Sequence, residues 1–316
     1  MKTLLISKRL PDSVLAEARA RYDVTLRQTE ASMSAEEVSD ALGSYDAILP
    51  TLGDDVSEAA ISGCADLRCG IIANFGVGFN HIDVAAAQAR GLMVSNTPGA
   101  VTDATADIAI TLMLMTARRA GEGERLVRSG GWGGWQPTQM LGLHVSGKTV
   151  GIIGMGRIGQ AIAQRCHGGF GCKIVFANRS EKSVPHAVQL GSMVEVAQAA
   201  DIVFVATPGG PETRHLVDAN VLGAMQPHAI LVNISRGDVV DETTLIAALK
   251  AGQLAGAGLD VYEHEPVVPE ALRAMENVTL LPHLGTNALE VREDMGRMAL
   301  ANLHAYFDGK PVPNPV

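Results

Sequence analysis

Short apolar runs alternate with helix-like patterns along the whole chain. In the N-terminal third, runs rich in β-branched residues predict strands at residues 3–6, 47–50, 69–73 and 93–95, with helices beginning near Asp12, Ser34, Ser57 and Asp83. A second series of strands is predicted at residues 149–153, 173–176, 202–206, 229–233, 256–259 and 278–280. Continuous apolar strands separated by helices are typical of parallel sheets covered on both faces. We therefore expect an α/β protein with two parallel sheets rather than one large sheet.

Two breaks in this pattern mark the expected domain boundaries. Asn96-Thr97-Pro98-Gly99 is a turn signal before a long predicted helix at residues 102–118, and Pro282-His283-Leu284-Gly285 precedes the last helix, at residues 288–306. Because no strand follows that last helix, it can pack back on the first unit. We expect a discontinuous first domain, residues 1–98 with 287–316, and a second domain, residues 99–286.

Composition and charge narrow the classes of function. The chain has 316 residues and a net charge of −9, which argues against a nucleic-acid or anionic-membrane partner. The N-terminus lacks the long apolar segment of a signal peptide. The most apolar stretch, residues 104–117, contains Asp107 and is shorter than the roughly 20 residues that span a bilayer. We expect a cytoplasmic protein.

The cysteines give no sign of a metal site. No Cys-x-x-Cys pair and no histidine cluster accompanies them, so buried free thiols are expected at Cys64, Cys69, Cys166 and Cys172.

The strongest motif is a glycine-rich loop after a predicted strand. Residues 149–153 lead into Gly154-Met155-Gly156-Arg157-Ile158-Gly159, and a helical pattern follows at residues 160–166. This is G-x-G-x-x-G in the strand–loop–helix context of a dinucleotide-binding unit. The first glycine allows a tight turn, the second lets the backbone approach a pyrophosphate, and the third lets the helix pack closely on the strand. The helix N-terminus then offers amide donors to the phosphates.

The end of the next strand bears on which dinucleotide is bound. Many NAD-binding units place Asp or Glu there, on the ribose 2′-hydroxyl, but this chain has Asn178-Arg179-Ser180. The Arg179 guanidinium and the Ser180 hydroxyl can hold a 2′-phosphate, and no carboxylate repels it. We predict NADP as the preferred cofactor. The alternative is that Arg179 is a solvated loop residue and NAD binds.

Three segments after later strands carry candidate catalytic groups. They contain Arg236, the carboxylates Glu263 and Glu265, and His283. Taken singly, each is as well explained as a surface or loop residue. Together at the carboxyl ends of parallel strands they predict a hydride-transfer site. Arg236 would hold a substrate carboxylate, and His283, oriented by a glutamate, would give a proton to the carbonyl oxygen.

These residues resemble the D-isomer-specific 2-hydroxyacid dehydrogenases over nearly the whole chain. The resemblance rests on Asn74-Phe75-Gly76-Val77-Gly78, on Asn96-Thr97-Pro98-Gly99 with Thr102-Asp103, on the glycine-rich loop, and on Ile234-Ser235-Arg236-Gly237, Asp260-Val261-Tyr262-Glu263-His264-Glu265-Pro266 and Pro282-His283-Leu284-Gly285-Thr286. The family fold is two Rossmann-like domains, with the discontinuous domain binding substrate and the other binding NAD(P).

The resemblance also implies residue roles. Arg236, Glu265 and His283 would be the catalytic three, with the acid directly before Pro266 chosen over Glu263. Substrate would contact Leu52, Gly76, Val77, Gly78, Arg236 and His283. The cofactor would contact Thr102, residues 154–159, Asn178, Arg179, Ser180, Thr207, Pro208, Thr213, Ile234, Ser235, Arg236, Asp260, His283 and Gly285.

The variant Asn80-His81 before Ile82-Asp83 resembles the glyoxylate and hydroxypyruvate reductase branch. This implies NADPH-dependent reduction of small 2-oxoacids to D-2-hydroxyacids. Reduction of larger 2-oxoacids, such as aryl pyruvates or 2-ketogluconate, is the alternative, and residues near Leu52 and Phe79 would decide between them. A less favoured alternative is a non-catalytic, NAD(P)-sensing binding protein.

Family members are usually homodimers joined through the cofactor domain. The apolar helix from Thr102, with Met113, Leu114 and Met115, is a candidate interface, although its composition suits a core helix equally well.

Overall fold

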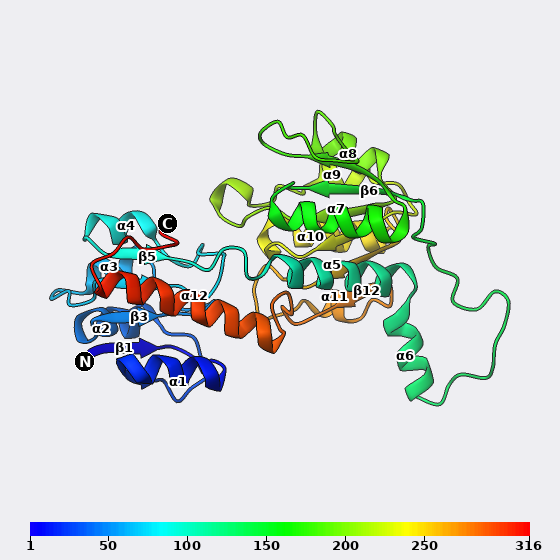
Figure 1. The fold of residues 1–316 in the computed structure, drawn as a ribbon. Helices are drawn as coiled ribbons and strands as arrows, with labels where there is room; N and C mark the ends of the chain where they lie inside the picture. The colour runs from blue at the N-terminus through cyan, green and yellow to red at the C-terminus, as the bar shows by residue number, and fades with distance from the viewer. The chain divides into compact units, whose positions relative to one another are not determined.

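The computed structural model describes residues 1–316, and the chain divides into two compact units. Unit 1 contains Met1–Val101 and Asn287–Val316, and unit 2 contains Thr102–Thr286. Each unit has its own parallel β-sheet (Figure 1). The α/β class with two parallel sheets is therefore confirmed. The roles expected for the two units, one for substrate and one for cofactor, remain predictions.

Unit 1 is built on a five-stranded parallel sheet in the order β2-β1-β3-β4-β5. Ser34 begins α2 with a reciprocal capping box to Glu37, and the Asp83 side chain caps α4. The elements are β1 (Lys2–Ile6), α1 (Asp12–Arg21), β2 (Tyr22–Leu26), α2 (Ala35–Ser44), β3 (Ala47–Leu49), α3 (Glu58–Gly63), β4 (Ile71–Ala73), α4 (Val84–Ala89), β5 (Met93–Ser95) and α12 (Leu289–Phe307).

Unit 2 is built on a seven-stranded parallel sheet in the order β12-β11-β10-β9-β6-β7-β8. Its elements are α5 (Thr102–Ala117), α6 (Ala120–Arg128), β6 (Thr149–Ile153), α7 (Arg157–Phe170), β7 (Lys173–Ala177), β8 (Ala187–Gln189), α8 (Met193–Ala199), β9 (Ile202–Val205), η1 (Pro211–Thr213), α9 (Ala219–Ala224), β10 (Ile230–Asn233), η2 (Gly237–Val239), α10 (Glu242–Lys250), β11 (Gly256–Leu259), α11 (Glu270–Arg273) and β12 (Val278–Leu280).

Successive side chains of the unit 2 strands point to opposite faces of the sheet, and a separate hydrophobic core lies on each face. In β9, Ile202 and Phe204 pack with α5 and α7, while Val203 and Val205 pack with α8, α9 and α10. All four side chains are fully buried. Burial on both faces explains why these strands read as continuous apolar runs.

Two edge strands, β2 and β8, are not predicted from the sequence because polar or exposed residues interrupt their apolar pattern. In β2 the polar residues Asp23 and Thr25 alternate with apolar ones, and the strand follows α1 without an intervening turn residue. In β8 only three residues pair with β7, and Val188 is 60% exposed. Exposure at the edge thus removes from β2 and β8 the apolar run that still marks the edge strands β5 and β12.

Two further expectations bear on cysteines and membranes. Cys64, Cys69, Cys166 and Cys172 are buried and unpaired, as the sequence predicts. None of the helices is both long and apolar enough to cross a membrane.

Candidate active site

The glycine-rich loop lies at the point where the order of strands in unit 2 reverses. From β6 the chain proceeds outward through β7 and β8, and then returns to β9 on the other side of β6. Ligands of open parallel sheets bind at such a switch point, at the carboxyl ends of the strands. No side chain caps the N-terminus of α7, so the amides of its first turn have no partner inside the helix. These amides suit the phosphates of a dinucleotide.

The turn after β7 is tied to the glycine-rich loop through Asn178. Its Oδ1 accepts a hydrogen bond from the Met155 amide at 3.1 Å, and its Nδ2 donates to the Ser180 carbonyl at 2.9 Å. Gln189, from the unpredicted strand β8, donates to the carbonyls of Asn178 and Ser180 at 3.3 Å each. The amide of Asn178 therefore organises the turn.

Arg179 projects from this turn into solvent. Its side chain is 92% exposed, and its Nη1 lies 3.2 Å from Oε2 of Glu212 in η1. An exposed ion pair contributes only about 0–1 kcal/mol, so Arg179 can exchange this partner for a phosphate at little cost.

The Asn233 side chain closes the turn that carries Arg236. Its Oδ1 accepts from the Ser235 amide at 3.0 Å, and its Nδ2 donates to the Arg236 carbonyl at 3.0 Å. The Nη1 of Arg236 donates to the Ser235 carbonyl at 2.7 Å. Burial lowers the pKa of Arg236, while the charges of Glu265 and Asp238 act to raise it. A guanidinium remains cationic at neutral pH.

Glu265 and His283 form a hydrogen-bonded pair. The Nδ1 of His283 lies 2.8 Å from Oε2 of Glu265, and each side chain is 29% exposed. The other oxygen, Oε1, accepts from the Tyr262 amide at 3.0 Å. Burial acts to raise the pKa of Glu265, but the hydrogen bond from His283, the Tyr262 amide and the charge of Arg236 outweigh it and lower the pKa. The structure thus brings Arg236, Glu265 and His283 together, while Glu263 does not contact His283.

Asp260 fixes the backbone around His283. Its two carboxylate oxygens accept from the amides of Leu284 at 2.6 Å and Gly285 at 2.8 Å, and its carbonyl accepts from the His283 amide at 2.9 Å. Burial raises the pKa of Asp260 despite these bonds. Asp260, expected to line the cofactor cleft, is 1% exposed, and its carboxylate supports the His283 loop.

In unit 1, the side chains of two asparagines hold the loop at residues 76–78. The side-chain amide of Asn74 donates to the carbonyls of Gly76 and Gly78 at 3.0 Å each, and that of Asn96 donates to the Val77 carbonyl at 2.9 Å. A trans peptide directs its N–H opposite to its carbonyl. Because the carbonyls of Gly76 and Val77 bond to the protein, the amides of Val77 and Gly78 point the other way.

The remaining predicted residues lie at strand ends or helix starts. Thr207 follows β9, and its hydroxyl is buried without a hydrogen-bond partner in the chain. The Thr213 hydroxyl donates to the Pro208 carbonyl at 2.8 Å. Ile234 is buried after β10, Thr102 begins α5, and Leu52, after β3 in unit 1, is 37% exposed.

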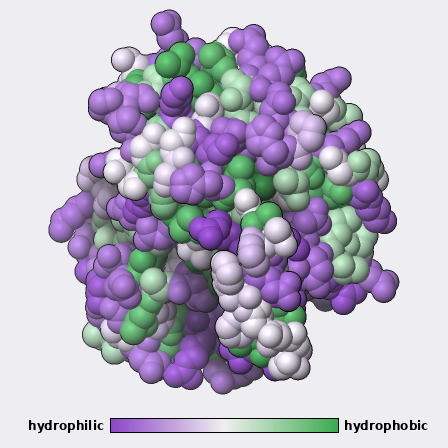
Figure 2. Space-filling view, turned by 90° about the vertical axis from the view of Figure 1, so that its right-hand side faces the viewer, coloured by the Kyte–Doolittle hydropathy of each residue, from purple (hydrophilic) through white to green (hydrophobic).

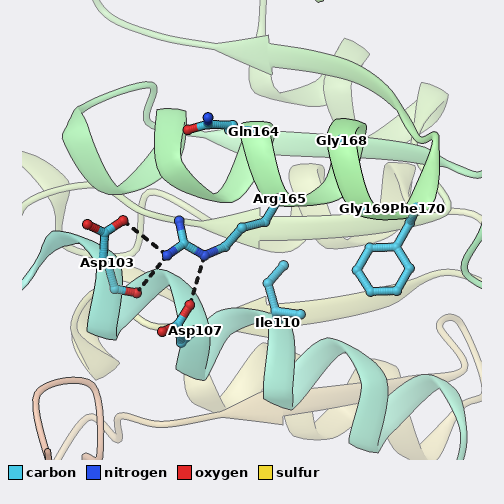
Figure 3. Close-up of a pocket in the computed structure, with 8 residues that line it drawn as sticks. All are labelled: Asp103, Asp107, Ile110, Gln164, Arg165, Gly168, Gly169 and Phe170. Atoms are coloured by element: carbon cyan, nitrogen blue, oxygen red, sulfur yellow. Dashed lines mark hydrogen bonds and ion pairs between the residues drawn. The ribbon is translucent and has the colours of Figure 1, made fainter.

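A hollow on unit 2 is lined by other residues of α5 and α7. Figure 3 shows it between α5 and α7, where Arg165 donates to the carboxylates of Asp103 at 3.0 Å and Asp107 at 2.8 Å. Ile110 and Phe170, both half-buried, form its apolar part. None of the predicted site residues lines it.

Comparison with known proteins places this arrangement in a family. Residues 110–285, all within unit 2, match the family model described as D-isomer specific 2-hydroxyacid dehydrogenase, NAD binding domain. The glyoxylate reductase of Pyrococcus furiosus is 39% identical over 99% of this chain and 94% of its own. The chain belongs to this family. A D-isomer-specific 2-hydroxyacid dehydrogenase is an oxidoreductase with a nicotinamide cofactor.

Two further relatives extend the comparison. The hydroxyphenylpyruvate reductase of Plectranthus scutellarioides is 45% identical over 78% of each chain. The crystal structure of an NADPH-dependent glyoxylate/hydroxypyruvate reductase from Sinorhizobium meliloti, in complex with NADP and malonate, has a TM-score of 0.89 and 35% identity, covering 100% of this chain and 96% of that one.

The residues of this chain fit a dinucleotide at the glycine-rich loop. A Cβ added at Gly156 would meet no atom within 4 Å, so the chain leaves open space there. The unpartnered hydroxyl of Thr207 follows β9, the strand beside β6 in the sheet.

We expect Gly156→Ala to weaken cofactor binding without weakening the fold. The φ of Gly156 is −74°, which alanine adopts readily, and the added methyl group enters the open space that a pyrophosphate would approach. The Kd for NADPH, measured by fluorescence titration, should rise by about tenfold or more, which corresponds to roughly 1.4 kcal/mol. The Tm of the free protein should not fall.

Gly159→Ala is the matched control. Its Cβ would lie 2.2 Å from the Gly154 carbonyl oxygen, so this variant should lose stability. An unchanged Kd in Gly156→Ala would show that the pyrophosphate does not approach this position.

Proposed function

We propose that the protein uses NADPH to reduce small 2-oxoacids, with glyoxylate and hydroxypyruvate as leading substrates, to D-2-hydroxyacids. The observation that carries this proposal is the His283–Glu265 pair beside Arg236, on the unit that carries the glycine-rich loop. The relatives named glyoxylate reductase and glyoxylate/hydroxypyruvate reductase support the substrate class.

The proton donor in this proposal is Nε2 of His283. Its Nδ1 is engaged by Glu265 at 2.8 Å, so Nε2 is the ring nitrogen left for a substrate. A protonated imidazole can give the Nε2 proton to the carbonyl oxygen and become neutral, while the proton on Nδ1 stays there, hydrogen-bonded to Glu265. The ionised Glu265 stabilises the imidazolium before the transfer and fixes the ring orientation. The bound nicotinamide supplies the hydride.

In this proposal the substrate carboxylate is bound by the Arg236 guanidinium and by the backbone amides of Val77 and Gly78. The Arg236 guanidinium can donate two parallel hydrogen bonds to a substrate carboxylate. In unit 1, the amides of Val77 and Gly78 are donors suited to an anion, since their peptide planes are set by Asn74 and Asn96. Gly76 and Leu52 remain proposed contacts of the substrate.

The NADP preference is supported by the composition of the turn after β7. Arg179 and Ser180 are exposed there, and residues 178–180 contain no carboxylate. Charge-assisted hydrogen bonds contribute about 1.5–3 kcal/mol, more than the exposed pair with Glu212 that Arg179 would give up. Use of NADPH favours reduction as the physiological direction.

Reduction of larger 2-oxoacids is the second candidate. The relative named hydroxyphenylpyruvate reductase has the highest identity of the three relatives compared, over a shorter stretch of the chain. Leu52 and Phe79, 37% and 36% exposed, are the side chains of unit 1 that would distinguish the two substrate sizes.

Initial rates with each cofactor test the proposed activity. We expect NADPH to be preferred over NADH with glyoxylate and with hydroxypyruvate, and hydroxyphenylpyruvate to be the poorer substrate. In Arg179→Ala, the KM for NADPH should rise by about 10- to 100-fold because one charge-assisted contact of roughly 1.5–3 kcal/mol is lost. The KM for NADH serves as the internal control and should stay unchanged. Equal use of NADH by the unmodified protein would contradict the NADP proposal, and faster turnover of hydroxyphenylpyruvate would favour the second candidate.

Replacing His283 tests the proton donor. We expect His283→Ala to lower kcat by about 10²- to 10⁴-fold, the usual contribution of a positioned general acid. The Kd for NADPH should change by less than about twofold, because the glycine-rich loop is untouched. Turnover in the variant close to that of the unmodified protein would remove His283 from the role of proton donor.

We propose that the chain forms a homodimer through unit 2. Of the candidate interface residues, Met113 is fully buried in the core of unit 2 and cannot serve, while Leu114 and Met115 are half-buried. Exposed apolar side chains occur instead on α6 and on the segment that follows it, which projects from unit 2 (Figure 1): Val127, Trp132, Trp135 and Leu141. Figure 2 shows hydrophobic groups exposed among hydrophilic ones on this side of the molecule.

Light scattering coupled to gel filtration measures the oligomeric state. We expect twice the 33.1 kDa mass of one chain for the unmodified protein. Changing Trp132 and Trp135 together to serine should shift the protein towards monomer, because exposed aromatic side chains are typical anchors of interfaces. A monomeric unmodified protein would contradict the proposal.

A further inference from the structure

A second histidine–glutamate pair lies in the loop that carries Glu265. The Nε2 of His215 lies 2.9 Å from Oε1 of Glu263, two residues before Glu265. The Glu263 side chain is only 12% exposed, whereas that of His215 is 36% exposed. Arg214 adds a weaker contact to the same oxygen, at 3.3 Å from a side chain that is 61% exposed. The proposed reaction uses neither His215 nor Glu263.

The backbone of His215 holds a different loop. Its amide donates to the Asp238 carbonyl at 2.7 Å, two residues after Arg236. His215 therefore bonds to two segments of the chain. One partner, Glu263, is two residues from Glu265, and the other, Asp238, is two residues from Arg236. The φ of His215 is +49°, in the left-handed region that non-glycine residues seldom adopt. Backbone in this region persists where surrounding contacts determine it, as the two bonds do here.

The two segments are also in direct backbone contact. A Cβ added at Gly237 would lie 1.8 Å from the carbonyl carbon of Tyr262 and 2.3 Å from the Glu263 amide nitrogen. The Tyr262 amide in turn donates to Glu265 at 3.0 Å. A shift of Glu263 is therefore transmitted to the peptide that holds the Glu265 carboxylate.

Glu263 lies beside another buried carboxylate. Its amide is 3.4 Å from Oε2 of Glu242, which is 9% exposed. Burial and the charge of Glu263 raise the pKa of Glu242. Without His215, the Glu263 carboxylate would be buried beside Glu242 with the exposed Arg214 as its one cation. Moving towards solvent would then lower its free energy, because a buried charge without a close partner is costly.

We propose that His215 is a positioning residue that keeps the Arg236 and Glu265 loops in register, so that Glu265 orients His283. This inference rests on the roles proposed above for Arg236, Glu265 and His283. The side-chain bond to Glu263 fixes one loop, and the backbone bond to Asp238 fixes the other.

Replacing His215 tests this role. We expect His215→Ala to lower kcat by about 10- to 100-fold, the scale of loss when a catalytic group is misplaced by about an ångström. The Kd for NADPH should change by less than about twofold. His215→Gln places an amide Nε2 donor near the position of the histidine Nε2 and should restore kcat to within about threefold of the unmodified protein. Both variants bear the same left-handed backbone, so the difference between them reports the side-chain bond alone.

His228→Ala is the matched control. The Nε2 of His228 lies 2.7 Å from Oδ1 of Asp201, a pair of the same kind that sits before β9 and β10, at the opposite ends of the strands from the catalytic loops. This variant should keep its kcat. Glu263→Leu removes the acceptor of the His215 bond, and the only charge that it leaves without this partner is the exposed Arg214. It should lower kcat by about the same 10- to 100-fold, which keeps the inference testable if His215→Ala does not fold.

The outcomes separate this inference from the proposed function. An unchanged kcat in His215→Ala or Glu263→Leu, or a loss in His215→Ala that glutamine does not restore, would overturn the positioning role. A comparable loss in His228→Ala would do the same. If His283→Ala keeps its turnover, the proposed function fails first. If His283→Ala is inactive and the His215 variants are fully active, only the positioning role fails.

Discussion

The hydrogen bond between Glu265 and His283 is the contact on which the rest of the site depends. It joins two loops that follow different strands, β11 and β12, and it engages Nδ1 of His283, so that Nε2 is the ring nitrogen not bound to Glu265. Such a bond at 2.8 Å requires both backbones to be fixed. Asp260 fixes the His283 loop by accepting hydrogen bonds from the amides of Leu284 and Gly285. The Tyr262 amide fixes the Glu265 carboxylate by donating a hydrogen bond to it. The surrounding charges then keep Glu265 ionised, because they lower its pKa against the opposing effect of burial.

Those parts of the fold and the site that leave a local pattern are predictable from the sequence. The central strands are buried on both faces, so their apolar runs identify them, and the glycine-rich loop is recognisable because β6 and α7 flank it. The edge strands β2 and β8 are missed because exposure removes that pattern. The contacts of Asn178 and His215 are missed for another reason. Each side chain bonds to a residue far along the chain that folding brings close, and no spacing in the sequence encodes such a bond.

The absence of a carboxylate after β7 has a structural counterpart in the second role of Asn178. An amide can accept from the Met155 N–H and donate to the Ser180 carbonyl at the same time, which an ionised aspartate cannot do. The asparagine therefore connects the glycine-rich loop to the turn while leaving the turn without negative charge of its own. Arg179 then lies beside a neutral anchor, and its one carboxylate partner, Glu212, comes from a separate segment and is 84% exposed. Electrostatics at this turn thus favour an anion, provided that the exposed pair is given up.

The two histidine–glutamate pairs show how one loop can serve two purposes. Glu263 and Glu265 are separated by a single residue, so in an extended strand they would lie on the same side. Here they bond to His215 and His283, which come from different segments, and both histidines have positive φ. The chain turns after Glu263, as the antiparallel bridge between His264 and Val267 shows. Gly237 admits the backbone of this turn at a distance that any side chain would prevent. Because the geometry of Glu265 is set by backbone packing, a substitution within this loop would disturb the Glu265–His283 bond, whereas exposed positions such as Leu52 and Phe79 can change without such a cost.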